Sequence, residues 1–171
     1  MPLTDKTLVH DDLGVETKVE PTVLFQITDH FQRRDEGQDF VVGTLLGTED
    51  VAGVVQVCSC FPVPHTKVED QIALNSEFFT TMLGLQQRVQ PKHKVVGWYA
   101  TGERISDATI LFHEFFQGQD VERPVHLLLN LGLGKQQRMS SKAFISVDMT
   151  LGEARLGTSF REVPLSFVTG E

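Results

Sequence analysis

The chain has 171 residues, of which 40% are hydrophobic, and it carries a formal net charge of −8. This length and apolar content are typical of one soluble globular domain. The acidic balance argues against broad, salt-dependent adhesion to nucleic acid or anionic lipid, because phosphate contacts need clustered Lys and Arg side chains. Apolar runs such as Val54 to Pro64 are far shorter than the roughly 20 residues of a membrane-spanning helix. Because the polar N-terminus also lacks the apolar core of a secretory signal, we expect a cytosolic or nuclear protein.

The first elements expected are a strand and a helix that follow a mobile tail. Residues 1–14 mix charged residues and Thr without periodicity, so we expect a tail there and one domain over residues 15–171. Thr17 to Glu20 predicts a short strand, and Pro21 suits the first turn of a helix that would end within Arg33 to Gly37. Apolar residues recur at helical spacing in that helix. They are Val23, Leu24, Ile27 and Phe31.

Two strands are expected next. Phe40 to Gly47 is a nearly continuous apolar run, and Val51 to Val63 follows it across the turn formers Thr48 to Asp50. Cys58 and Cys60 lie two apart in the second strand and should share one of its faces. Because neighbouring Cys-x-Cys positions of a strand rarely form an unstrained disulfide, we interpret both as small hydrophobes without a chemical role.

The longest helix is expected over Asp70 to Val89, where apolar residues form a stripe and Pro91 follows the end. Its apolar residues are Ile72, Phe78, Phe79, Met82, Leu85 and Val89. They span more than one stripe, because Phe78 and Phe79 point about 100° apart on a helix. The set Phe78, Met82, Leu85 and Val89 is therefore either part of the core or a surface that a partner covers.

The remaining elements complete a mixed sheet. Val95 to Tyr99 predicts a buried strand, and Ser106 with Asp107 suits the N-cap and first turn of a helix that Gly118 would end. The apolar face of that helix is Ala108, Leu111, Phe112, Phe115 and Phe116. Strands are expected at Val125 to Leu129, Met139 to Val147 and Leu156 to Val168. This order predicts the α/β class, with a mixed β-sheet packed by about three helices.

Several motifs suggest a chemistry that their surroundings do not support. His113-Glu114 lacks the second imidazole of a zincin, since position 117 is Gln, so His113 is expected to pack at the surface or to form a local hydrogen bond. Gly132 to Lys135 resembles a phosphate loop, but a hairpin turn fits its place between two strands better. Three basic positions, Lys135, Arg138 and Lys142, are interpreted as solvated, because no aromatic residues alternate with them to stack on bases.

Four segments resemble the MPN (Mov34/JAMM-like) domain family in their order and spacing. They are Phe40 to Thr48, Cys60 to His65, Val95 to Gly102 and Phe112 to Phe116. The resemblance covers the chain from about Val15 onward. It implies the MPN fold, which is similar to that of cytidine deaminases.

The catalytic members of that family bind zinc through residues that this chain lacks. There Gly-Trp-Tyr is followed by His-x-His-Pro and then by Ser-x-x-Asp, because a catalytic zinc needs three protein ligands and one open position for water. The two histidine positions correspond to Ala100 and Gly102, the serine to Ser106, the aspartate to Thr109 and the catalytic glutamate to Phe40. The resemblance therefore implies a non-catalytic domain that holds no metal and no cofactor.

The resemblance implies a cytoplasmic scaffold in a translation initiation complex that works with the small ribosomal subunit. Such domains pair with another MPN subunit through helical surfaces, for which the tentative interface here is Phe78, Met82, Leu85 and Val89. The alternatives are a ubiquitin-directed isopeptidase, a ubiquitin-binding pseudoenzyme, or the non-catalytic MPN subunit of the proteasome lid. That lid subunit keeps one histidine and a proline where this chain has Ala100 and Glu103.

Overall fold

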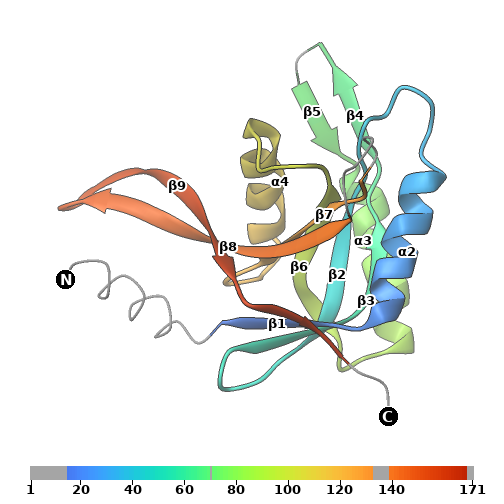
Figure 1. Cartoon of the computed structure of the whole chain (residues 1–171), viewed down its shortest axis with the longest axis horizontal. Coiled ribbons are helices and arrows are strands. Elements are labelled where there is room, and N and C mark those ends of the chain that lie inside the picture. Colours follow the sequence, from blue (N-terminus) through green and yellow to red (C-terminus); the bar gives the residue numbers. More distant parts are fainter. Residues whose placement is uncertain (1–14, 70, 133–138, 169–171) are drawn as a thin grey trace.

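Two hydrophobic clusters of buried residues organise the molecule. Figure 1 shows the arrangement of its helices and strands. The computed structural model describes residues 15–69, 71–132 and 139–168. The strands are β1 (Glu16–Val19), β2 (Val42–Glu49), β3 (Val54–Pro62), β4 (His65–Val68), β5 (Gln71–Leu74), β6 (Lys94–Thr101), β7 (Val125–Asn130), β8 (Ser140–Leu151), β9 (Ala154–Val163) and β10 (Leu165–Phe167), and the helices are α2 (Pro21–Gln32), α3 (Ser76–Val89) and α4 (Asp107–Gln117). The expected mixed sheet with helices on it is confirmed.

The main sheet has eight strands in the order β10-β1-β3-β2-β6-β7-β8-β9. Parallel pairs join β1 to β3, β1 to β10 and β6 to β7, whereas the other neighbours are antiparallel. β2 and β6 lie at its centre and are almost entirely buried. The start of β2 lies beside the end of β6, since Val42 is opposite Ala100, and this brings the residues before β2 close to the end of β6.

Helix α2 covers one face of the sheet. Pro21 begins it, and Val23, Ile27 and Phe31 are buried at helical spacing, as the sequence predicts. These side chains pack with residues of the central strands, among them Leu45 and Tyr99, in a cluster that we term the α2-side core.

Helices α3 and α4 cover the other face. Phe79 of α3 and Phe112 and Phe116 of α4 pack with Leu46 and Trp98 in a second cluster, which we term the α3/α4-side core. The expected bounds of α4 are confirmed, with Ser106 before its first residue and Gly118 after its last.

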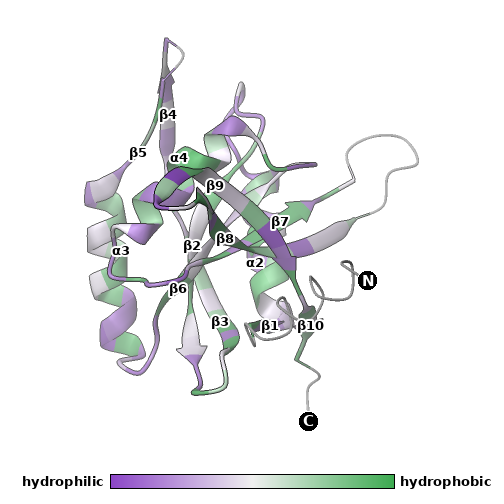
Figure 2. Ribbon diagram, turned by 90° about the vertical axis from the view of Figure 1, so that its left-hand side faces the viewer, coloured by the Kyte–Doolittle hydropathy of each residue, from purple (hydrophilic) through white to green (hydrophobic). Residues whose placement is uncertain are grey.

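The segment before α3 is not helical, which corrects the expected helix over Asp70 to Val89. Gln71–Leu74 forms β5, which pairs with β4, and α3 begins only at Ser76. Within β5, Ile72 and Leu74 are partly buried and pack against the α3/α4-side core, so this stretch follows the period of a strand. Asp70 itself lies outside the described residues. The β4–β5 hairpin rises above the ends of the helices in both Figure 1 and Figure 2.

Strands β8 and β9 form a long hairpin that extends well away from the helices (Figure 1). β8 reaches Leu151 and not Val147, and the expected strand over Leu156 to Val168 is split into β9 and β10 around Pro164. The side chains of Leu151 and Leu156 are largely exposed near the tip. No helix in the described ranges has the length and apolar content needed to cross a membrane.

Candidate functional site

The five positions that the family resemblance singles out lie together at one pocket of about 260 Å³. They are Phe40, Ala100, Gly102, Ser106 and Thr109. The pocket forms where the end of β6 meets the residues before β2 and the first turn of α4. Positions far apart in the sequence are therefore brought together as the resemblance implies.

Ala100 and Gly102 supply no metal-binding atoms to this pocket. The Ala100 methyl is buried and packs in the α3/α4-side core. Gly102 has no side chain, and its backbone N–H donates a hydrogen bond to the Leu129 carbonyl at 2.8 Å. Neither side chain offers the lone pair that a zinc ligand requires.

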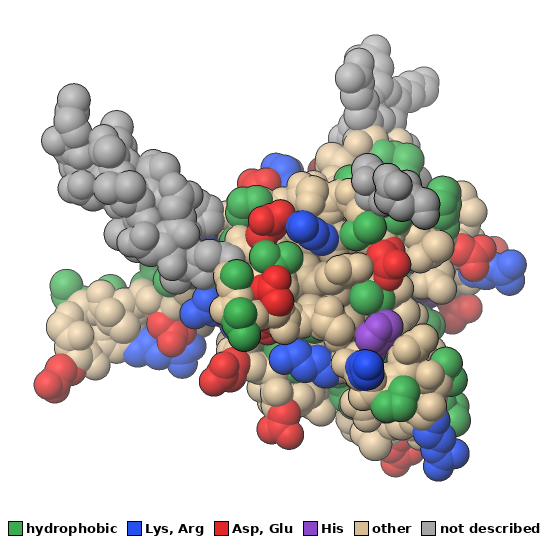
Figure 3. Space-filling model, turned by 90° about the horizontal axis from the view of Figure 1, so that it is seen from below, with side chains coloured by type: hydrophobic (Ala, Val, Ile, Leu, Met, Phe, Trp, Pro, Cys, Tyr) green, Lys and Arg blue, Asp and Glu red, His purple; other side chains and the backbone are tan. Residues whose placement is uncertain are grey.

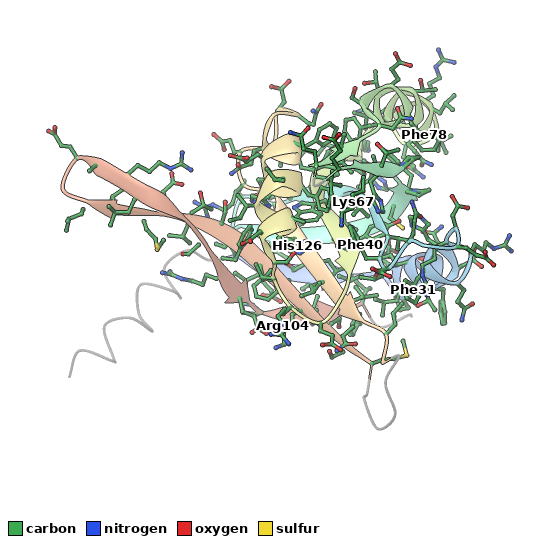
Figure 4. The ribbon with its side chains drawn as sticks, turned by 90° about the horizontal axis from the view of Figure 1, so that it is seen from above. Phe31, Phe40, Lys67, Phe78, Arg104 and His126 are labelled. Atoms are coloured by element: carbon green, nitrogen blue, oxygen red, sulfur yellow. The ribbon has the colours of Figure 1, made fainter. Side chains whose placement is uncertain are left out.

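Phe40 belongs to an aromatic cluster and not to an acid–base site. Its ring stacks on the His65 imidazole, with centroids 4.5 Å apart and planes 13° apart, and lies 5.9 Å from the Phe112 ring. Phe40 lies between α2 and α4 in the view of Figure 4. Burial lowers the pKa of His65 below its usual value, which favours the neutral ring in this apolar setting.

Ser106 and Thr109 act as capping residues of α4. The Ser106 backbone N–H donates to Thr109 Oγ1 at 3.0 Å, and the Thr109 N–H donates to the Ser106 carbonyl at 3.0 Å. These contacts satisfy backbone groups that a helix start leaves unpaired. The Thr109 hydroxyl is thus used by the helix, and it is not the anionic oxygen that an aspartate would offer a metal.

The pocket does not fit a catalytic zinc. Across the described ranges, no group of three or more His, Cys, Asp or Glu side chains is placed to hold a metal ion. The chemistry of the five positions, which are aromatic, methyl, hydrogen and two hydroxyl groups, agrees with that finding.

Comparison with known proteins places this geometry in a family. The family model described as JAB1/Mov34/MPN/PAD-1 ubiquitin protease matches residues 13–122. The chain belongs to this family. Its MPN fold is therefore established.

Curated relatives within the family are named as components of a translation initiation factor. The F subunit of eukaryotic translation initiation factor 3 from Dictyostelium discoideum is 38% identical over 159 residues, which cover 92% of this chain and 55% of the relative. The F-1 subunit from Drosophila mojavensis is 34% identical and the F subunit from Aedes aegypti is 35% identical, covering 93% and 88% of this chain and 56% and 52% of the relatives. The chain spans about half the length of these relatives.

The Gly97-Trp98-Tyr99 motif of the MPN domain has a structural role in this chain. A side chain at Gly97 would collide with the Val125 backbone, and one at Gly43 would collide with the Tyr99 ring. The Tyr99 hydroxyl shares a hydrogen bond of 2.7 Å with His30 Nδ1. These residues are therefore needed to build the MPN core even where the zinc ligands are absent.

A buried pair of histidines is a feature that sequence reasoning missed. His113 is 1% exposed and not at the surface, and its Nδ1 accepts a hydrogen bond of 2.9 Å from Trp98 Nε1. The ring of His126, which is fully buried, stacks on Trp98 with centroids 3.7 Å apart. Burial lowers the pKa of His113 to about 4 and that of His126 to about 3. Both imidazoles are therefore neutral packing groups near neutral pH.

The signal for this pair lay in the apolar pattern around each histidine. His126 lies inside the apolar run of β7, which is buried from Val125 to Leu129. His113 lies one residue after the buried Phe112 and three before the buried Phe116 on α4. Residues at those two positions are expected to be buried, so an imidazole there is better explained by packing than by a zincin motif.

The tentative interface residues lie on α3, a helix with few buried side chains. Phe79 is the one fully buried residue of this helix, and Phe78 and Met82 are partly buried. Leu85 is 49% exposed and Val89 is 74% exposed. Met82 packs against the α3/α4-side core, so the four residues are not equally available to a partner.

The other sequence candidates acquire no chemical role in the described structure. Cys58 and Cys60 are free thiols, and burial raises their pKa values to about 11 and about 12. Lys135 and Arg138 lie outside the described residues, as does most of the predicted loop from Gly132 to Lys135.

Proposed function

We propose that the chain is a non-catalytic MPN scaffold of the eukaryotic translation initiation factor 3 complex. In this role it supports assembly with the small ribosomal subunit and the start of protein synthesis in the cytoplasm. Relatives named as the F subunit of that factor support the proposal, since they match most of this chain. The observation that supports the loss of catalysis is that Ala100, Gly102 and Thr109, which by resemblance correspond to the zinc ligands, line one pocket.

The replacement of the general base supports a non-enzymatic role as well. By resemblance to the catalytic members, Phe40 takes the place of the glutamate that would activate water, and its ring is stacked on His65. Three ligands and the base are thus replaced together. A single lost ligand could be compensated by a neighbouring donor, but the residues lining this pocket do not provide a substitute set.

The proposed partner is another MPN subunit, which by resemblance is the h subunit of the same factor, together with the other subunits of the complex. The exposed apolar side chains of α3 support a protein contact, because such a band is usually covered in an assembly. Direct contact with RNA is not part of the proposal. On the face seen from below, basic side chains are interspersed with acidic ones, a distribution that does not favour phosphate contacts (Figure 3).

The rival functions are a ubiquitin-directed isopeptidase, a ubiquitin-binding pseudoenzyme and the MPN subunit of the proteasome lid. The description of the family model supports a ubiquitin connection at the level of the family. The relatives named above support the initiation factor.

Metal analysis and a cleavage assay test the proposal. The purified protein, loaded with excess zinc and then desalted, is expected to retain no stoichiometric zinc and to leave ubiquitin chains intact. A catalytically active member of the family, treated in parallel, serves as the positive control. One zinc per chain together with chelator-sensitive cleavage would overturn the proposal.

A further inference from the structure

The pocket that does not fit zinc has the mixed apolar and polar lining of a small-molecule site. Its volume of about 260 Å³ is slightly below the roughly 300 to 1,000 Å³ that is usual for ligand pockets, which suits a small ligand. Five of its lining residues have apolar side chains, which we term the apolar wall: Phe40, Ala100, Ala108, Phe112 and Leu128. An apolar wall with a few polar groups at the rim is the usual composition of a ligand pocket.

Two opposite charges lie at the same pocket without being paired to each other. Arg104 and Asp39 both line it, and both side chains are exposed to solvent. The ion pairs among the described residues are Arg33 with Asp29, Lys94 with Glu49 and Arg155 with Asp148. Neither Arg104 nor Asp39 takes part in these. The pocket therefore presents a donor-only guanidinium and an acceptor-only carboxylate, each available to a ligand.

We propose that this pocket binds a free α-amino acid with an apolar side chain. The carboxylate of the amino acid would bind the Arg104 guanidinium, which suits two parallel N–H···O contacts. Its ammonium group would bind the Asp39 carboxylate. Its side chain would lie against the apolar wall, where the Phe40 and Phe112 rings exclude water from it.

The charge arrangement selects this class of ligand over simpler ones. A monoanion such as a fatty acid would satisfy Arg104 but would bring a second negative charge towards Asp39. An amine would pair with Asp39 but would bring a second positive charge towards Arg104. A zwitterion meets both charges, and an apolar side chain meets the wall, so specificity follows from repulsion as well as attraction.

Titration of the isotope-labelled full chain with L-leucine, followed by protein NMR, tests the proposal. We expect saturable shifts of the backbone amide signals of Gly102, Ser106 and Ala108, which line the pocket. Arg104→Gln and Asp39→Asn are each expected to weaken binding about tenfold or more, equivalent to about 1.4 kcal/mol. Arg123→Gln and Asp35→Asn, which remove the same charges from exposed positions outside the pocket, are the matched controls and should bind as the parent does.

Two analogues assign each charge to its partner. Leucinamide lacks the carboxylate, so its weaker binding should no longer respond to Arg104→Gln. N-acetyl-leucine lacks the ammonium group, so its binding should no longer respond to Asp39→Asn. Equal binding of leucine and both analogues would overturn the proposal, and so would the absence of saturable shifts up to roughly ten millimolar leucine.

The inference rests on the proposed absence of zinc from the pocket, but the two can fail separately. Zinc bound there together with chelator-sensitive cleavage of ubiquitin chains would contradict the proposed function whether or not leucine binds. A zinc-free protein without leucine binding would leave the scaffold function intact and would contradict the ligand alone.

Discussion

At the scale of single residues, Phe40 carries much of the proposed loss of catalysis. Its ring lines the pocket with Ala100 and stacks on His65. By resemblance to the catalytic members, we propose that this apolar ring stands where they hold a base. Restoring ligands elsewhere in the pocket leaves this obstacle in place.

The double variant Ala100→His, Gly102→His is therefore expected to remain inactive against ubiquitin chains. Thr109 would still not supply an anionic third ligand, and a positioned base contributes on the order of 100-fold or more to such reactions. Gly102 also has φ +157, a conformation that a histidine adopts with strain. A cleavage assay with added zinc measures the outcome, and efficient cleavage would show that the base lies elsewhere than at position 40.

The buried imidazoles predict how stability depends on pH. Burial lowers the pKa of His113 to about 4 and of His126 to about 3, from 6.5 in an exposed histidine. At pH values between the folded-state and unfolded-state pKa of each histidine, the unfolded chain binds more protons than the folded one. The free energy of unfolding therefore decreases as the pH falls from about 6.5 towards 3. The full loss amounts to roughly 3 to 5 kcal/mol for each imidazole.

His126→Phe tests this pH dependence. The aromatic ring can keep the stack on Trp98, while the titrating nitrogens, which lack hydrogen-bond partners among the described residues, are removed. We expect a smaller loss of stability between neutral and acidic pH than in the parent. Denaturant unfolding followed by the fluorescence of Trp98 measures it, and an unchanged pH dependence would contradict the assignment.

At the scale of elements, α3 has one side in the core and one side exposed, and its residues should respond differently to substitution. Leu85→Asp is expected to weaken pairing with the proposed MPN partner several-fold or more, because a charge would be desolvated at the contact. The thermal stability of the isolated chain should change little, since Leu85 is 49% exposed.

Met82→Asp is the contrasting variant on the same helix. Met82 packs against the α3/α4-side core, so a charge there should destabilise the isolated chain as well as any complex. Co-purification and thermal unfolding, measured for both variants, separate the two effects. Intact pairing of a folded Leu85→Asp variant would place the interface elsewhere.

Gly84, in the middle of α3, gives a sharper test of the same surface. A methyl group at this position would meet no atom within 4 Å in the isolated chain, so Gly84→Ala should stabilise it by about 0.5 to 1 kcal/mol through helix propensity. If a partner approaches closely at this position, the same change should weaken pairing. Thermal unfolding measures the expected gain in stability, and a binding titration measures the expected loss of affinity for the partner. Improved pairing of the variant would rule out close approach at Gly84.

The sequence predicted some elements well because local and tertiary preferences agreed there. Pro21 and the spacing of Val23, Ile27 and Phe31 define α2, and Ser106 with Gly118 bounds α4. In the stretch before α3, the local preference and the tertiary arrangement did not agree. Ile72 fits a helical stripe in the sequence, but the pairing of β5 with β4 places it on a strand, and no local signal distinguishes the two for a short apolar run.

The candidate site could be predicted only in part, for a related reason. The five positions at the pocket follow from the order of motifs that the MPN resemblance supplied. The stack of Phe40 on His65 did not follow, because it joins a residue before β2 to the start of the β4–β5 hairpin, which was not expected. Contacts of this kind depend on the arrangement of elements and not on spacing along the chain.

At the scale of the whole molecule, the described fold combines the core of an MPN domain with surfaces that one chain leaves uncovered. Exposed apolar side chains lie on α3 and along the β8–β9 hairpin, which extends away from the helices (Figure 1). Exposed apolar surfaces of this kind often mark sites of contact with other proteins. The proposed scaffold role is therefore best tested inside the proposed assembly.

Affinity purification of the tagged chain from cells is expected to recover components of initiation factor 3, including a second MPN subunit, with the small ribosomal subunit. The Leu85→Asp variant should recover less of the MPN partner. Arg123→Gln, a substitution at an exposed residue outside α3, should recover the same proteins as the unmodified chain. Quantitative mass spectrometry of the three purifications measures the difference. Recovery of proteasome lid components or of ubiquitin conjugates in place of initiation factor components would favour one of the rival functions, because membership of a complex follows from the surfaces that a protein presents and not from its fold.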